Sequence, residues 1–136
     1  MATTLEVKLR IPFHDLDPMH VVWHGNYLKY FDVTRFELFK QARVDLYTYS
    51  IEHGIIFPVT RSSTKHIIPL RHDDEIICKA TVTEAVNKIG IDFEIRLAEN
   101  GKLCARGRGE QLAVKLPKME LLLEIPKDVT AALGFA

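Results

Sequence analysis

The feature that most constrains the fold is a long segment, residues 26–43, in which apolar side chains recur every three or four positions. The stripe with helical spacing consists of Tyr27, Phe31, Thr34, Leu38 and Ala42. Such spacing predicts a helix. Charged residues interrupt the other faces, but apolar residues occupy many of the neighbouring positions as well, so the helix is expected to be covered on most of its circumference. We therefore expect it to form the core of the domain.

Elsewhere the apolar pattern has a period of two, which is typical of half-buried strands. The predicted strands are 5–13, 55–70 (one long strand, or two joined by a bend), 75–86, 91–97 and 103–116. In the last segment the apolar phase slips at Gly107 and Gly109, which predicts a bulge or a sharp coil there. The pair Asn100-Gly101 favours a type I′ turn before that segment.

Two short helices complete the prediction, one over residues 45–53 that ends at Gly54 and one over residues 126–133. The order of a strand, a long helix and four further strands predicts an α+β fold, in which the helix crosses one face of a mostly antiparallel five-stranded sheet. A length of 136 residues fits a single domain over residues 1–136. One helix covers only part of such a sheet, so we expect a homodimer or a larger homo-oligomer.

Composition excludes several classes of protein. Eighteen Lys and Arg residues balance eighteen Asp and Glu residues, so a general binder of nucleic acid is not expected. No apolar stretch approaches the roughly 20 residues of a membrane-spanning helix, and charges interrupt the N-terminus too early for a signal sequence. Two cysteines, Cys78 and Cys104, are too few for a disulfide framework and are expected to be buried in strands. A soluble cytoplasmic domain is the expectation.

The densest group of chemically versatile side chains precedes the long helix, over residues 13–27. The segment reads Phe-His-Asp-Leu-Asp-Pro-Met-His-Val-Val-Trp-His-Gly-Asn-Tyr. The first N–H groups of a helix have no partner within the helix, and the helix dipole favours negative charge there. A carboxylate stays ionised at such a place and a developing oxyanion finds donors, which are the two parts that an acyl hydrolase needs.

This segment resembles the signature of the 4-hydroxybenzoyl-CoA thioesterase branch of the hotdog-fold superfamily. The residues that carry the resemblance are Phe13, Asp15, Asp17, Pro18 and the run Val21-Val22-Trp23-His24-Gly25-Asn26-Tyr27-Leu28, with a weaker match over 67–75. The resemblance implies a long helix wrapped by a strongly curved antiparallel sheet. It also implies hydrolysis of an acyl-CoA thioester without a metal or another cofactor, since coenzyme A enters as part of the substrate. The site would lie between the subunits of a homodimer or homotetramer.

The resemblance assigns Asp17 to the catalytic carboxylate, His24 to a position that is His or Tyr in the family, and the N–H groups near His24 and Gly25 to the polarisation of the thioester carbonyl. Asp17 would activate water as a general base or attack the carbonyl and form an anhydride, and the sequence leaves both routes open. Without a Cβ, Gly25 would let the carbonyl approach the helix. Asn26 is the expected helix cap, and Asp15 is expected to brace the loop.

The candidate substrate-binding residues lie in the same loop, at the start of the helix and on the following strand. They are Met19, Trp23, Tyr27, Thr60, Arg61, Ser62, Ser63, Thr64 and Lys65. Bulk at Met19 would narrow the acyl pocket, and Trp23 and Tyr27 either contact the acyl chain or pack in the core. The segment 60–66 is polar on both faces of a predicted strand, so it is either an exposed edge or, as the resemblance favours, the wall of a cleft at a dimer seam.

Basic residues that would meet the phosphates of coenzyme A are, by location only, Arg61, Lys65, Arg71 and Lys88. A metal site is not expected, because Val21 stands where the zincin pattern needs Glu, and His20 and His24 lie in a loop rather than on a helix. The remaining histidines, His14, His53, His66 and His72, are expected on ordinary surfaces. Two other functions stay open, namely an acyl-carrier-protein thioesterase and a non-catalytic module that binds an acyl group or coenzyme A.

Overall fold

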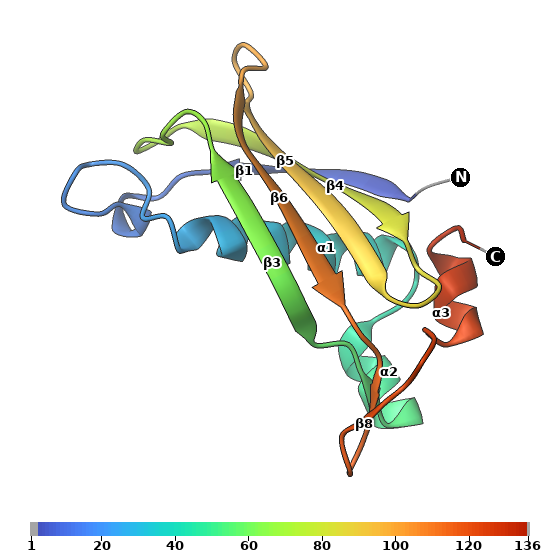
Figure 1. Cartoon of the computed structure of the whole chain (residues 1–136). Coiled ribbons are helices and arrows are strands. Elements are labelled where there is room, and N and C mark those ends of the chain that lie inside the picture. The colour runs from blue at the N-terminus through green and yellow to red at the C-terminus, as the bar shows by residue number, and fades with distance from the viewer. Residues whose placement is uncertain (1–2, 136) are drawn as a thin grey trace.

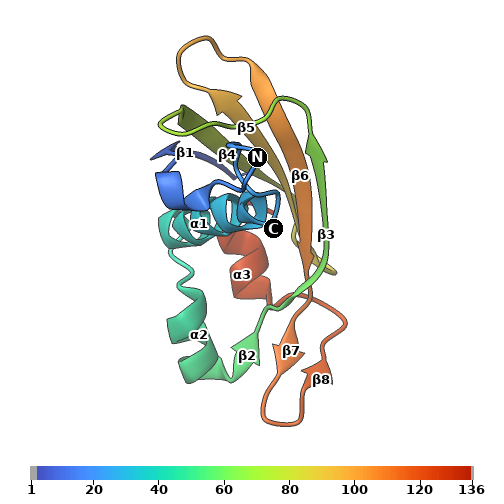
Figure 2. The same ribbon diagram turned by 90° about the vertical axis from the view of Figure 1, so that its left-hand side faces the viewer.

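A computed structural model describes residues 3–135, so the two ends of the predicted domain lie outside the described residues. Its elements are β1 (Thr4–Arg10), a 3-10 turn (Phe13–Asp15), α1 (Asn26–Gln41), α2 (Leu46–His53), β2 (Ile55–Ile56), β3 (Val59–His66), β4 (Glu75–Glu84), β5 (Ile89–Leu97), β6 (Leu103–Gln111), β7 (Val114–Lys115), β8 (Glu120–Leu121) and α3 (Lys127–Ala132). The main sheet has the order β1-β4-β5-β6-β3, with every neighbouring pair antiparallel. It curves around α1 (Figures 1 and 2). The predicted α+β architecture is confirmed.

The core lies between α1 and the concave face of this sheet. Phe31 of α1 stacks on Phe93 of β5 with their ring centroids 4.6 Å apart, an arrangement that adds to the gain from apolar burial. The prediction that α1 is covered on most of its circumference is wrong. Leu28, Val33 and Phe36 are 43%, 39% and 49% exposed, because no element within residues 3–135 packs over that side of the helix.

Gly107 and Gly109 do not mark a bulge, contrary to the prediction. Both stay in register with β3 and β5. A Cβ at Gly107 would lie 2.4 Å from the ring of Phe31, whereas one at Gly109 would lie 3.6 Å from Phe93. The phase of β6 therefore continues through Gly107, where a missing side chain makes room for the aromatic ring of α1, and it changes only after β6 ends at Gln111.

Two of the predicted segments each contribute a short piece to a second sheet. Segment 55–70 forms two strands, β2 and β3, which is the second of its two predicted alternatives, whereas the predicted single strand 103–116 divides into β6 and β7. The short pieces join β8 in a three-stranded sheet of order β2-β7-β8. This sheet and α2 project beyond the main sheet (Figure 2).

Local boundaries differ from the prediction in a few places. Phe13, predicted as the last inward residue of β1, is 70% exposed in the 3-10 turn. The predicted type I′ turn is also wrong, since Gly101 has a φ of 73° but Asn100 is not left-handed, and type I′ needs both. The short helix α2 follows the prediction, with the Asp45 side chain capping its start and Gly54 ending it at a φ of 66°. No helix within residues 3–135 is both long and apolar enough to span a membrane.

Candidate active site

The loop before α1 is a closed hairpin held by backbone hydrogen bonds. Its strands meet in a bridge between Leu16 and Val22, and the Asp17 N–H donates to the Val21 carbonyl at 2.8 Å. At the tip, the His20 N–H donates to the Asp17 carbonyl at 2.9 Å. Pro18 is the second residue of this turn, a position that suits its fixed φ. Asp17 is thereby held on a short, well-connected hairpin.

The carboxylate of Asp17 retains capacity to accept a proton. Its Oδ1 accepts the backbone N–H of Met19 at 2.8 Å, whereas its Oδ2 has no partner among residues 3–135. Asp17 opens into a cavity of about 230 Å³ between the hairpin, the start of α1 and the end of β3. The cavity is lined by Asp17, Met19, Val21, Val22, His24, Tyr27, His66, Ile67 and Pro69. The structure therefore brings together four sequence-predicted residues, Asp17, Met19, His24 and Tyr27.

The start of α1 supplies two free backbone donors. The Asn26 N–H donates to the Trp23 carbonyl at 2.9 Å and the Tyr27 N–H to the His24 carbonyl at 3.3 Å. The N–H groups of His24 and Gly25 find no acceptor in the part of the chain that the structure describes. Two consecutive amides at a helix start form an arrangement suited to binding an anion.

Gly25 and Asn26 differ from their predicted roles. A Cβ at Gly25 would lie 2.3 Å from the indole of Trp23, so the indole, rather than an approaching carbonyl, fills the space that the missing side chain leaves. Asn26 is the first residue of α1 and does not cap it, and its side-chain amide donates to the Asp15 carbonyl at 2.8 Å. Gly25 stands at the cap position. Trp23 thus covers the start of the helix and does not line the Asp17 cavity.

Asp15 braces the loop, as predicted. It is 3% exposed, and its carboxylate accepts hydrogen bonds from Lys29 Nζ at 2.7 Å and from the Tyr30 hydroxyl at 2.6 Å. Burial alone would raise the pKa of the Asp15 carboxyl, but the bonds and charge of these two α1 residues hold that pKa below its ordinary value. Asp15 therefore anchors the hairpin to the first turns of α1 as a buried anion.

His66 is a site residue that the sequence interpretation missed. Its ring meets the ring of Tyr27 edge to face, with centroids 4.4 Å apart, and it lines the Asp17 cavity. Burial raises the pKa of the Tyr27 hydroxyl. The available signal was the phase of β3, because His66 alternates with Ser62 and Thr64 and so lies on the same face of the strand.

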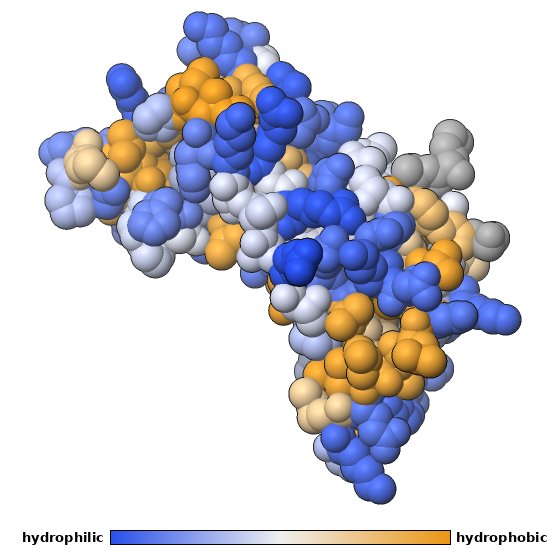
Figure 3. All heavy atoms as spheres, in the orientation of Figure 1, coloured by the Kyte–Doolittle hydropathy of each residue, from blue (hydrophilic) through white to orange (hydrophobic). Residues whose placement is uncertain are grey.

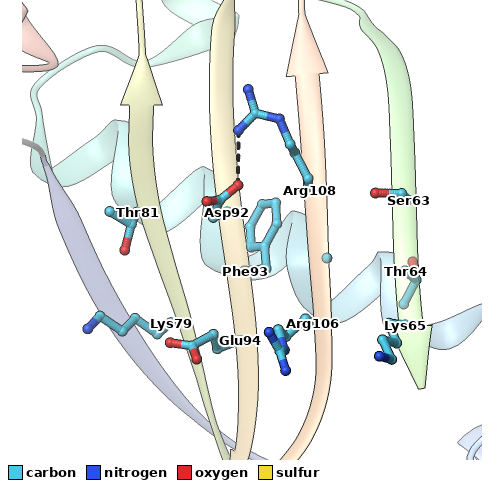
Figure 4. A pocket seen from close by; sticks show the side chains of 11 residues that line it. Ser63, Thr64, Lys65, Lys79, Thr81, Asp92, Phe93, Glu94, Arg106 and Arg108 are labelled. Atoms are coloured by element: carbon cyan, nitrogen blue, oxygen red, sulfur yellow. Dashed lines mark hydrogen bonds and ion pairs between the residues drawn. The ribbon is translucent and has the colours of Figure 1, made fainter. Parts of the chain in front are cut away.

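The polar strand 60–65 does not line one site. Thr64 pairs with Gly107, which faces Phe31 of α1, so Ser62 and Thr64 lie on the α1 side of the sheet. Strand alternation places Arg61, Ser63 and Lys65 on the opposite face, where Figure 4 shows the latter two. Thr60 lies at a register shift and its hydroxyl donates to the Glu110 carbonyl at 3.4 Å. Within one chain these residues are not brought to Asp17, and their contact with substrate stays a prediction.

A surface hollow of about 580 Å³ lies on that opposite face. It is lined by charged side chains of β3 to β6 such as Lys65, Lys79, Asp92, Arg106 and Arg108 (Figure 4), on a face covered by hydrophilic groups (Figure 3). Its Arg108 is paired with Asp92 at 2.9 Å. Its lining residues include no helix start, so the hollow lacks the free backbone amides that an acyl-transfer site uses to bind an oxyanion.

Two other basic candidates have other contacts in the structure. Lys88 Nζ pairs with Glu110 at 3.1 Å and with Glu84 at 3.7 Å. Arg71 is exposed, and its backbone N–H donates to the Asp74 carboxylate at 2.9 Å. Within residues 3–135 no group of three or more His, Cys, Asp or Glu residues has an arrangement that would hold a metal ion.

A second cavity, of about 200 Å³, lies farther along the seam between α1 and β3. Its residues include Leu28, Phe31, Asp32 and Arg35 of α1 and Ser62 of β3. Arg35 is one of the charged residues that interrupt the other faces of the predicted helix, and in the structure it is only 9% exposed. Burial lowers the pKa of its guanidinium, and the charge of Asp32 opposes that shift.

Comparison with known proteins agrees with this geometry. A family model described as the thioesterase-like superfamily matches residues 11–133. The acyl-CoA thioesterase YbgC of Haemophilus influenzae is 28% identical over 124 residues, which cover 91% of this chain and 90% of that protein.

Solved structures share the fold. A 1,4-dihydroxy-2-naphthoyl-CoA thioesterase from Synechocystis superposes with a TM-score of 0.88 at 20% identity, covering 96% of this chain and 95% of the other. The 4-hydroxybenzoyl-CoA thioesterase from Pseudomonas sp. strain CBS-3 superposes with a TM-score of 0.85 at 19% identity, covering 96% and 99%. The hotdog fold implied by the loop signature is confirmed.

Proposed function

This chain belongs to the thioesterase-like superfamily and is therefore a thioester hydrolase, and we propose that its substrates are acyl-CoA thioesters. The observation that carries the proposal is the cavity at the start of α1. There Asp17, whose Oδ2 has no partner among the described residues, opens into the same recess as His24. The N–H groups of His24 and Gly25 likewise have no acceptor among residues 3–135. The similarity to the YbgC acyl-CoA thioesterase supports the choice of coenzyme A as the leaving group.

The proposed reaction needs only these groups and water. The thioester carbonyl oxygen accepts the N–H groups of His24 and Gly25, and each such donor contributes roughly 3 kcal/mol to lowering the barrier. In the general-base route, Asp17 takes a proton from water as the water oxygen bonds to the carbonyl carbon. The C–S bond then breaks, and coenzyme A leaves as a thiolate that takes up a proton. In the nucleophilic route, Asp17 itself bonds to the carbonyl carbon, the C–S bond breaks and coenzyme A leaves as a thiolate that takes up a proton. Water then hydrolyses the resulting anhydride, which releases the acid and restores the Asp17 carboxylate.

We propose that the site is completed in a homodimer formed through β3. This strand pairs only with β6 within the described chain, so one edge of the main sheet is free. The exposed apolar residues Leu28, Phe36 and Val59 flank the same seam. A second copy paired along this edge would place the outward residues of β3, including Lys65, near the bound coenzyme A. Sedimentation of the purified protein tests the dimer, and the predicted cytoplasmic location needs imaging of the tagged chain.

Replacement of Asp17 by Asn tests the mechanism. We expect kcat/KM for acyl-CoA hydrolysis, followed by release of free thiol, to fall by about 10²- to 10⁴-fold, with circular dichroism unchanged. Asp73→Asn is the matched control, since Asp73 is an exposed aspartate in a left-handed turn that Asn adopts readily. An Asp17→Asn enzyme with the wild-type rate would eliminate the mechanism.

Kinetic measurements with acyl-CoA and acyl-carrier-protein thioesters separate the other two functions. If acyl-carrier-protein thioesters are cleaved faster than the same acyl-CoAs, the chain is a carrier-protein thioesterase. If acyl-CoAs bind without thiol release from any of them, the chain is a binding module. Hydrolysis of acyl-CoAs at the higher kcat/KM supports the proposal.

A further inference from the structure

The second cavity of the α1–β3 seam contains a buried cation whose hydrogen bonds are incomplete. Nη2 of Arg35 pairs with Asp32 Oδ1 at 2.9 Å. Nε of the same guanidinium is buried and has no hydrogen-bond partner within residues 3–135. The carboxylate of Asp32 is itself 53% exposed and pairs with Nη2 only, so the Nε side of the guanidinium lacks an acceptor.

An unpartnered buried donor on a charged group needs a physical explanation. Leaving such a group unpaired costs free energy that a native structure rarely tolerates. Almost all buried polar atoms have a partner in the protein, an ordered water or a ligand. The guanidinium is charged at any physiological pH and fits a carboxylate with two parallel hydrogen bonds. Arg35 is therefore equipped to receive an acceptor that enters the cavity.

The walls of this cavity suit the carbon skeleton of an acyl group. Leu28, Phe31, Val59 and Phe93 contribute apolar surface, and the polar residues of the lining are Asp32, Arg35, Ser62 and Arg108. Apolar walls with a few placed polar groups are typical of a small-molecule site.

Both this cavity and the Asp17 cavity border the helix α1, at residues that follow one another in sequence. Tyr27 lines the first cavity and Leu28, the next residue, lines the second. An α-helix rises about 1.5 Å per residue, so Arg35 lies about 12 Å beyond Tyr27 along the axis of α1. An extended chain of roughly ten bonds spans this length. An acyl group of that length, with its thioester carbon at the helix start, is long enough to extend to the level of Arg35 along α1.

We propose that Arg35 selects the acyl group by binding a carboxylate or hydroxyl at its far end, so that the preferred substrates are medium-chain acyl-CoAs with a polar terminus. This inference rests on the proposed function, because it takes the thioester to lie beside Asp17. Arg35 binds no reacting atom and determines specificity only.

The test compares two acyl-CoAs of equal length, decanedioyl-CoA and decanoyl-CoA. We expect the wild-type enzyme to prefer decanedioyl-CoA, and Arg35→Met to lower kcat/KM for decanedioyl-CoA by roughly 10- to 100-fold while leaving decanoyl-CoA nearly unchanged. Met keeps the apolar stem, and the carboxylate of Asp32 that loses its partner is 53% exposed to water, so Arg35→Met leaves no buried unpaired charge from this pair. Arg35→Lys should recover part of the preference, since it restores the charge without the planar fork.

The matched control is Lys40→Met, which removes one positive charge from the same helix at a side chain that is 66% exposed. It should leave both rates unchanged. An equal effect of Arg35→Met on both substrates overturns the inference. The inference is also overturned if Arg35→Met weakens the dimer in sedimentation but leaves the ratio of the two kcat/KM values unchanged. In that case the hydrogen-bond acceptor of Arg35 would come from a second copy of the chain. Failure of the wild-type enzyme to release thiol from any acyl-CoA would instead overturn the proposed function.

Discussion

Replacement of Asp15 by Asn tests how the loop that carries Asp17 is held. The wild-type carboxylate accepts one hydrogen bond from the buried Tyr30 hydroxyl and one from Lys29, whose side chain is 49% exposed. A hydrogen bond to a charged group contributes about 1.5–3 kcal/mol, and the share of the half-exposed Lys29 is smaller because water screens it. We expect Asp15→Asn to lower the free energy of unfolding by about 3 kcal/mol at pH 7, equivalent to roughly 10 °C in Tm for a chain of this size.

The pH dependence of this difference is the sharper part of the prediction. The pKa of the Asp15 carboxyl is depressed in the folded protein, so its contribution is complete above the pKa of an unfolded aspartate and is lost as pH falls through the lower folded value. Urea unfolding of the two proteins, at the same protein concentration, should therefore show a large difference in the free energy of unfolding at pH 7 and little difference near pH 2. A gap that does not change between these pH values would refute the charged anchor, and Asp73→Asn serves as the surface control.

Three further outcomes follow from the packing. Gly107→Ala should destabilise the fold by about 1–3 kcal/mol through overpacking, whereas Gly109→Ala, whose Cβ meets only an ordinary contact at 3.6 Å, should change Tm far less; similar losses would contradict the packing argument. Gly25→Ala should lower both Tm and kcat in the wild type but not in a Trp23→Ala background, because the obstructing indole is then absent. Effects of the two substitutions on Tm that simply add in the double variant would count against the contact. Burial raises the pKa of the Cys78 thiol to about 11, so a thiol reagent at pH 8 should label it only after unfolding, as followed by mass spectrometry.

The positions of the loop and of the long helix could be predicted from short-range patterns in the sequence. Asp17 is followed by a proline turn, and α1 begins within the predicted segment, because turn residues and helical periodicity act over a few neighbours. The strand alternation of β4 and β5 was likewise predictable, since one face of each is buried against α1. The carboxylate and the helix start are close in sequence, and a short loop cannot separate them far.

The polar strand β3 shows a feature that sequence patterns alone could not predict, namely which of its residues line the cavity. Residues 60–65 share one composition, but β3 alternates, so Ser62 and Thr64 lie on one face and Ser63 and Lys65 on the other. His66 enters the cavity because the end of β3 lies against the start of α1. No local signal states which helix a strand will pack against.

By itself the sequence determined the element types, the loop before α1 and the family, because each depends on neighbouring residues or on a contiguous motif. Only the tertiary structure decided that Gly107 admits an aromatic ring, that a second small sheet takes the ends of two strands, and that Arg35 is buried. Each of these depends on what residues distant in sequence place opposite one another. Whether a charged residue on a helix meets water or a cavity is determined by the element packed against it, and that element lies elsewhere in the chain.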